Sequence, residues 1–100
     1  KKSFSKSLED LSINKDHLVY AENNLFIINK KSNNDFLIWP GVCPHQGGSL
    51  ESCSESGDKK VCPWHGLKIP AIKLNADHTT VSKYGFKFKL INEYIEITNE

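Results

Sequence analysis

The sequence predicts a single all-β domain of short antiparallel strands. One hundred residues, 38% of them hydrophobic, are enough for one small packed core. Apolar and polar residues alternate with the period of a β-strand in several short runs separated by polar turns, and only residues 7–11 have a helical pattern. The longest apolar stretches contain four or five residues, which is too short for a membrane span.

Six segments carry the strand signal, and polar turns connect most of them. Glu22-Asn23-Asn24 indicates a hairpin, and Asn92-Glu93 indicates another near the end of the chain. The segment around Pro70 suits an edge strand or a bend, because Pro cannot donate to a central ladder. The expected strands are residues 17–21, 25–30, 36–39, 67–74, 84–91 and 94–98.

Residues 40–66 do not follow this pattern. They contain five of the six Gly, three of the four Pro, all three Cys and two of the four His. Gly and Pro at that density indicate loops held in specific backbone conformations. The sequence therefore predicts that the functional chemistry lies in this segment.

Two short motifs in this segment pair a Cys with a His. Cys43 and His45 form C-x-H, and after sixteen residues Cys62 and His65 form C-x-x-H. Two thiolates and two imidazoles suit soft or borderline metals. A structural Cys₂His₂ zinc module that mediates a protein interaction is one interpretation. However, zinc sites usually group Cys with Cys and His with His, whereas here each motif supplies one of each.

The glycines that follow each histidine favour an iron–sulfur cluster over zinc, since exposed backbone N–H groups can donate to inorganic sulfide. The motifs CPHQGG and CPWHG resemble the signature of the Rieske [2Fe–2S] family. The resemblance implies one [2Fe–2S] cluster per chain. It places Cys43 and Cys62 on one iron and His45 and His65 on the other.

The resemblance also implies a Rieske-like antiparallel β-sandwich with a small cluster-binding subdomain of two ligand loops. We expect one domain over residues 1–100. The subdomain is expected at about 42–66, the base at about 8–41 and 67–100, and a flexible tail at 1–7.

Four residues around the motifs favour the low-potential oxygenase and ferredoxin branch of the family. Gly48 and Trp64 stand where high-potential Rieske proteins carry a disulfide, and Leu67 and Ile69 replace their Ser and Tyr. Fewer hydrogen bonds to sulfur stabilise the reduced cluster less. We therefore expect a potential near the low end of the family range, about −150 mV.

The function implied is single-electron transfer, either as a free-standing ferredoxin or as a domain of a larger oxygenase or hydroxylase. A reductase is the expected donor, and an oxygenase or hydroxylase component the expected acceptor. No catalytic residues and no activity of the chain alone are expected, because only His17 and His78 remain for a mononuclear iron. The chain begins with Lys and lacks Met, which suits either a trimmed start or a piece of a longer protein.

The amino-acid composition indicates the cellular location and excludes some classes of partner. All 13 basic residues are Lys and the net charge is +1, so bidentate recognition of nucleic acid is not expected. Three Cys do not suit a disulfide scaffold, and this predicts a reducing, cytoplasmic location without membrane contact. Cys53 lies between the motifs and is expected to be a free thiol.

Overall fold

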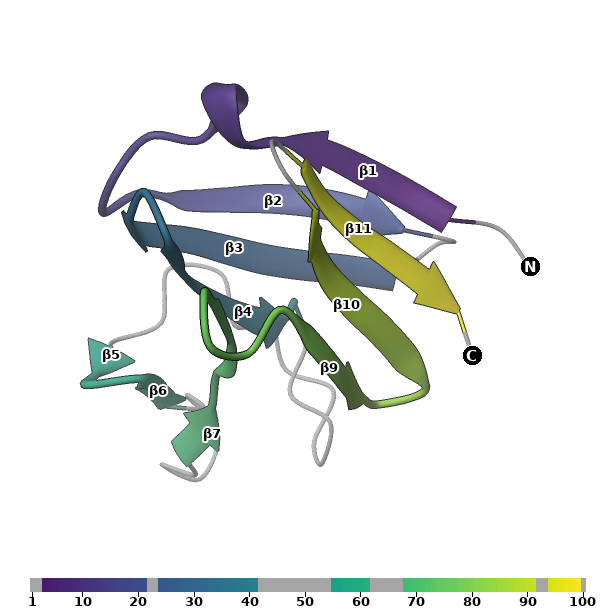
Figure 1. Cartoon of the computed structure of the whole chain (residues 1–100). Coiled ribbons are helices and arrows are strands. Elements are labelled where there is room, and N and C mark those ends of the chain that lie inside the picture. The colour runs from purple at the N-terminus through teal and green to yellow at the C-terminus, as the bar shows by residue number, and fades with distance from the viewer. Residues whose placement is uncertain (1–2, 22–23, 42–54, 62–67, 92–93, 100) are drawn as a thin grey trace.

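Two four-stranded antiparallel sheets pack face to face, and a third, smaller sheet lies beside them (Figure 1). The computed structural model describes residues 3–21, 24–41, 55–61, 68–91 and 94–99. The first sheet has the order β1-β11-β10-β9. Its strands are β1 (Ser3–Ser7), β9 (Thr80–Lys83), β10 (Phe86–Ile91) and β11 (Tyr94–Asn99).

The second sheet has the order β2-β3-β4-β8, and the third has the order β5-β6-β7. The strands of the second are β2 (Asp16–Ala21), β3 (Asn24–Ser32), β4 (Asp35–Pro40) and β8 (Ile72–Asn75). Those of the third are β5 (Glu55–Ser56), β6 (Lys59–Val61) and β7 (Lys68–Pro70). All named strand pairs of the described chain are antiparallel, which confirms the predicted fold class.

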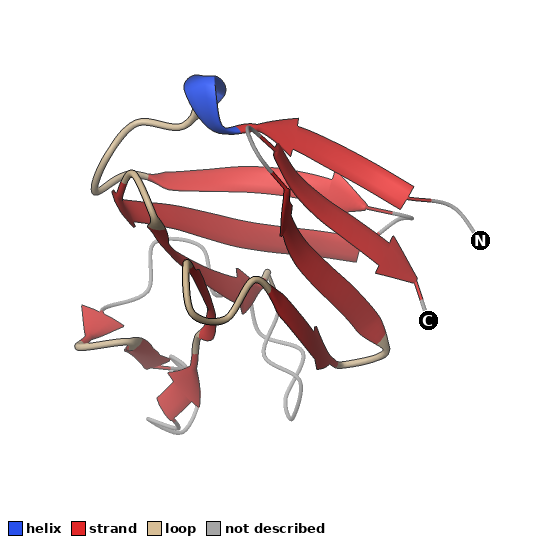
Figure 2. Cartoon of the chain, in the orientation of Figure 1, coloured by secondary structure: helices blue, strands red, loops and turns tan. Residues whose placement is uncertain are grey.

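The helical signal at residues 7–11 corresponds to one short 3₁₀ turn, Leu8–Asp10, the blue element in Figure 2. Within the expected tail at 1–7, residues 3–7 differ from the expectation, because Ser3–Ser7 form β1 along the edge of β11. The register runs from Ser3 opposite Thr98 to Ser7 opposite Tyr94. Backbone pairing with an open sheet edge orders this segment, and its side-chain pattern gives little sign of it.

Two expected strands differ in the structure: one begins later than expected, and the other is divided. Tyr84 and Gly85 have φ of 57° and 80° and form the turn between β9 and β10, so the expected strand 84–91 begins at Phe86. Gly adopts such a φ without steric cost, which explains the position of the turn. The expected strand 67–74 divides at Ala71 into β7 and β8, which belong to different sheets. The bend suggested by Pro70 is therefore a change of sheet.

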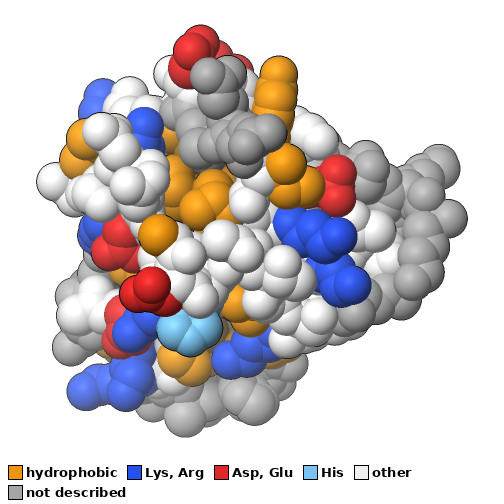
Figure 3. Space-filling view, viewed as in Figure 1, with side chains coloured by type: hydrophobic (Ala, Val, Ile, Leu, Met, Phe, Trp, Pro, Cys, Tyr) orange, Lys and Arg blue, Asp and Glu red, His pale blue; other side chains and the backbone are white. Residues whose placement is uncertain are grey.

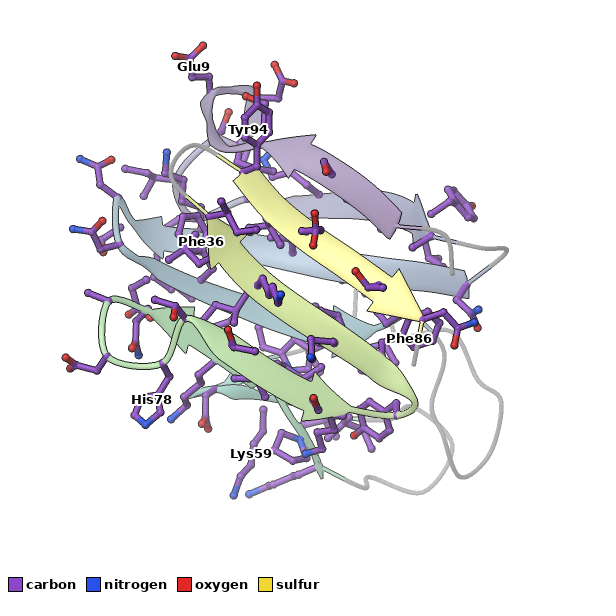
Figure 4. All side chains as sticks on the ribbon, turned by 45° about the vertical axis from the view of Figure 1, so that its right-hand side comes forward. Glu9, Phe36, Lys59, His78, Phe86 and Tyr94 are labelled. Atoms are coloured by element: carbon purple, nitrogen blue, oxygen red, sulfur yellow. The ribbon has the colours of Figure 1, made fainter. Side chains whose placement is uncertain are left out.

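The main core lies between the two four-stranded sheets. Phe26 meets Phe86 and Phe88 edge to face, with ring centroids 5.0 and 5.4 Å away. Phe36 and Phe86 lie toward opposite ends of this layer (Figure 4). Edge-to-face contacts between aromatic rings add to the stabilisation from burial. From here on, the base means the described chain without β5, β6 and β7, so it lacks residues 68–70 of the expected base, and the main core lies wholly within it.

A second, smaller core covers the opposite face of the second sheet. It consists of Ile27, Leu37, Trp39 and Ile69, with Ala71 packed against them. Successive strand residues point to opposite faces, so a sheet covered on both sides buries every residue along its central strands. This explains the four consecutive buried residues at 26–29 and at 36–39. Since Ile69 belongs to β7, the second core joins the small sheet to the base.

Candidate metal centre

The four predicted ligands lie outside the described residues. Cys43 and His45 fall in residues 42–54, called the first ligand segment, and Cys62 and His65 fall in residues 62–67, the second ligand segment. The residues used to predict the branch and the free thiol, namely Gly48, Cys53, Trp64 and Leu67, lie outside as well. The described strands that enter and leave these segments show where each segment begins and ends.

The second ligand segment connects two paired strands. β6 ends at Val61 and β7 begins at Lys68, and these two residues are directly opposite each other in the sheet. Opposed residues in an antiparallel pair lie about 5 Å apart. The segment that contains Cys62 and His65 therefore leaves the small sheet and returns to it at neighbouring positions on one edge.

The first ligand segment ends at the same edge. It follows Gly41 after β4 and is followed by Glu55, the first residue of β5. Glu55 is opposite Lys60, the residue before Val61. In an antiparallel sheet the start of one strand lies beside the end of the next. The end of the first ligand segment and both ends of the second thus meet at one edge of the three-stranded sheet.

Gly41 fixes the point where the chain leaves β4 for the first ligand segment. Its N–H donates to the carbonyl of Leu25 at 2.7 Å, and the residue is buried. A Cβ at this position would lie 2.6 Å from Cδ2 and 2.7 Å from Cβ of Leu25. Such distances are far inside van der Waals contact, so only Gly permits this close approach two residues before Cys43.

Trp39 connects β4, which precedes the first ligand segment, with β7, which follows the second. Its indole N–H donates to the carbonyl oxygen of Ile69 at 3.1 Å, in a buried environment. Trp39 is fully buried and belongs to β4, which precedes the first segment, whereas Ile69 belongs to β7, which follows the second. Buried Trp N–H groups usually find a partner, and here that partner fixes the small sheet on the base.

A buried lysine forms a second connection to the base. The Nζ of Lys60 lies 2.9 Å from Oδ2 of Asp16, and the Lys60 side chain has no exposed area. The same amine lies 4.8 Å from the ring centroid of Trp39. Asn29 donates from Nδ2 to the other oxygen of Asp16 at 2.8 Å. The carboxylate of Asp16 is therefore held by the second sheet and receives the lysine from β6.

These contacts lower the pKa of Asp16. Partial burial raises it, but the hydrogen bonds from Asn29 and Lys60 outweigh this effect, and the charges of Lys60 and Lys31 act in the same direction. The pKa therefore lies below its ordinary value of 3.8. Asp16 is thus a carboxylate at neutral pH and forms an ion pair with Lys60.

An exposed contact holds the turn between β5 and β6. Asp58 accepts from Lys73 of β8 at 2.8 Å, and the two side chains are 34% and 56% exposed. The backbone carbonyl of Asp58 also accepts from the N–H of Ala71 at 2.9 Å. The hydrogen bond from Lys73 lowers the pKa of Asp58 and raises that of Lys73. The hairpin that leads to the second ligand segment is thus bound at its turn.

The histidines outside the motifs have structural contacts. Nε2 of His17 accepts from the backbone N–H of Ser12 at 2.9 Å, and the backbone of His78 pairs with Asn75 in a tight turn. Within the described part of the chain no three His, Cys, Asp or Glu residues form a metal-binding group. His17 and His78 thus take part in local structure.

Asp16 and Lys60 were not predicted from the sequence. Lys60 is preceded by another lysine in a polar hairpin, and only its place opposite Ile69 on the inner face of the small sheet explains its burial.

Lys and acidic side chains are interspersed on the face seen in Figure 3, as expected for a net charge of +1. No helix in the described ranges is long and apolar enough to cross a membrane.

The donor set fits an iron–sulfur cluster at this edge. The two motifs in these segments supply two thiols and two imidazoles, a donor set that suits a centre bound from two sides. No curated protein and no solved structure matches the chain. The model of the Rieske [2Fe–2S] domain family matches residues 4–80, and it gives the zinc interpretation no support. Since this match covers more than half of the sequence, the chain belongs to the Rieske [2Fe–2S] domain family.

Proposed function

We propose that Cys43, His45, Cys62 and His65 hold the [2Fe–2S] cluster of this Rieske domain and that the chain passes single electrons between protein partners. Membership of the family implies the cluster and electron transfer. The cluster supplies one-electron redox chemistry. The observation that supports the ligand assignment is that the first ligand segment ends, and the second begins and ends, at one edge of the small sheet.

Three residues that hold the small sheet on the base have a positioning role. Trp39, Lys60 and Asp58 join the small sheet to the base at three separate points. Redox centres transfer electrons efficiently when their surroundings change little between oxidation states, because preorganised dipoles need no rearrangement. The contacts of the small sheet supply such a rigid support.

The finer assignment to the low-potential branch is part of the same proposal. Ile69 is the described member of the four residues that support it, and its side chain packs on Ile27, Leu37 and Trp39. A hydrocarbon side chain offers no hydrogen bond to a cluster sulfur, which favours a low potential. A reductase as donor, an oxygenase or hydroxylase component as acceptor and a cytoplasmic location complete the proposal. The length of the full reading frame distinguishes a ferredoxin from a domain of a larger enzyme.

Substitution of single cysteines tests the ligand assignment. Anaerobically purified Cys43→Ala and Cys62→Ala are expected to lose the acid-labile sulfide and the visible absorbance of the wild-type protein. Cys53→Ala is the matched control and is expected to keep both. Loss of the cluster in Cys53→Ala together with retention in either of the other variants would overturn the assignment.

Redox cycling tests the carrier role. We expect dithionite to reduce the protein by one electron per chain and ferricyanide to reoxidise it, with full recovery of the absorbance. A cluster that is lost within one cycle would contradict a role in repeated electron transfer.

A further inference from the structure

A buried ion pair lies between the base and the strand that leads to the second ligand segment. Lys60 is the next-to-last residue of β6, and Asp16 is the first residue of β2. Their charged atoms are 2.9 Å apart. The exposed fraction is 0% for the Lys60 side chain and 31% for that of Asp16. The lysine amine is therefore enclosed, while the carboxylate retains contact with solvent.

The surroundings of Asp16 are organised to receive this amine. Asp16 and Asn29 are opposite each other on β2 and β3, and the Asn29 side chain donates to the carboxylate at 2.8 Å. Asn29 is itself 3% exposed, and its Oδ1 has no hydrogen-bond partner in the described part of the chain. A buried acceptor without a partner has a cost in stability. The Nδ2 group of Asn29 thus orients the carboxylate of Asp16.

Stability alone does not explain a buried lysine at this position. A well-packed hydrophobic pair commonly stabilises a fold as well as a buried ion pair does. An ion pair adds a fixed orientation of its two side chains and a fixed local charge. The Trp39 ring, 4.8 Å from the amine, restricts the amine further and also carries the buried hydrogen bond to Ile69. The side chains of Asp16, Lys60 and Trp39 thus fix where β6 lies on the base.

The position in the sequence connects this arrangement to the cluster. Lys60 is two residues before Cys62, a separation of at most about 7 Å between Cα atoms. A positive charge near a redox centre stabilises its reduced, more negative state, and a negative charge has the opposite effect. In the native pair the two effects oppose each other.

From these contacts we infer that Asp16 and Lys60 are positioning residues for the cluster, which fix the second ligand segment and balance the charge beside it. This inference rests on the ligand assignment proposed above. Removal of Lys60 leaves the carboxylate, and removal of the Asp16 charge leaves the amine. The two single changes therefore act on the reduction potential with opposite signs, and the double change restores it.

The test measures the reduction potential and the reduced-state EPR spectrum of Lys60→Met, Asp16→Asn and the double variant. Lys59→Met is the matched control, because it removes the same charge from the neighbouring exposed residue of β6. The expected potential is lower in Lys60→Met, higher in Asp16→Asn and near the wild-type value in the double variant. In Lys59→Met the shift is expected to be smaller than in Lys60→Met.

Shifts of the same sign in both single variants, or shifts no larger than that of Lys59→Met, would overturn the inference. If Lys60→Met does not fold, the isosteric Asp16→Asn variant compared with Lys59→Met still decides the sign. Wild-type protein without iron and sulfide would instead contradict the function on which the inference rests, so the two failures are distinguishable.

Discussion

The indole nitrogen of Trp39 lies 3.1 Å from the carbonyl oxygen of Ile69, and this buried hydrogen bond joins the strand before the first ligand segment to the strand after the second. Each ligand segment thus adjoins, at one end, a strand that takes part in this hydrogen bond. The other ends are held by Glu55 and Val61 in the small sheet. The strands that border the proposed ligand segments are thus paired with others, which favours a precise geometry where these segments begin and end.

Replacement of Trp39 by Phe is expected to lower the free energy of unfolding by about 1–3 kcal/mol, because the Ile69 carbonyl is left buried without its donor. Urea unfolding of the cluster-loaded protein measures the change. Tyr20→Phe, at a residue that is 65% exposed, is the control and is expected to stay near wild type. Equal stability of the two variants would show that the bond contributes little.

A methyl group at residue 41 is expected to interfere with the start of the first ligand segment. Gly41→Ala places a Cβ against Leu25 and should cost about 1–3 kcal/mol through overpacking. Thermal unfolding and iron content per chain are the measurements. The double variant Gly41→Ala with Leu25→Gly removes the opposing side-chain atoms, including the Cβ of Leu25, so it should recover part of the iron content. If it recovers none, the steric explanation is incorrect.

The Asp16–Lys60 pair is expected to contribute to the acid sensitivity of the fold. The pKa of Asp16 is lowered in the native state, so its contribution to stability is present above the ordinary value of 3.8 and is lost as pH falls through the native pKa. The stability difference between wild type and Asp16→Asn should therefore shrink as pH falls from neutral to below 3.8. A difference independent of pH across this range would contradict the role of the carboxylate charge.

Removal of the cluster is expected to affect the small sheet more than the base. The main core contains Phe26, Phe88 and Ile95 and does not depend on the ligand segments. Metal binding often supplies the folding energy of the elements that carry its ligands. In apo-protein, amide hydrogen exchange should stay slow in β3 and β10 and become faster in β6 and β7. Equally fast exchange throughout would show that the base cannot fold without the cluster.

Much of the architecture could be predicted from the sequence, because strand periodicity is a local signal. The hairpin at residues 16–32 and the final hairpin were anticipated within a few residues. β1 was not, since its order comes from pairing with β11, a partner more than eighty residues away. The positions of β5, β6 and β9 were also missed, because strands of two to four residues carry too few side chains for a pattern.

A ligand set could be proposed from the sequence, because its chemistry lies in motifs of three or four residues, and it remains a prediction. The contacts that hold the small sheet on the base could not be predicted. Lys60 and Asp16 are 44 positions apart, and nothing local distinguishes a buried lysine from an exposed one. Likewise, the bond from Trp39 to Ile69 depends on how β7 crosses the base. Such contacts follow from tertiary structure alone.

The measurement that tests the central claim most directly is the EPR spectrum of the dithionite-reduced, anaerobically purified protein, combined with iron and acid-labile sulfide analysis. We predict two irons and two sulfides per chain and a rhombic signal from the reduced cluster, with loss of that signal in Cys62→Ala and retention in Cys53→Ala. A colourless protein that contains one zinc ion and no sulfide would contradict the account.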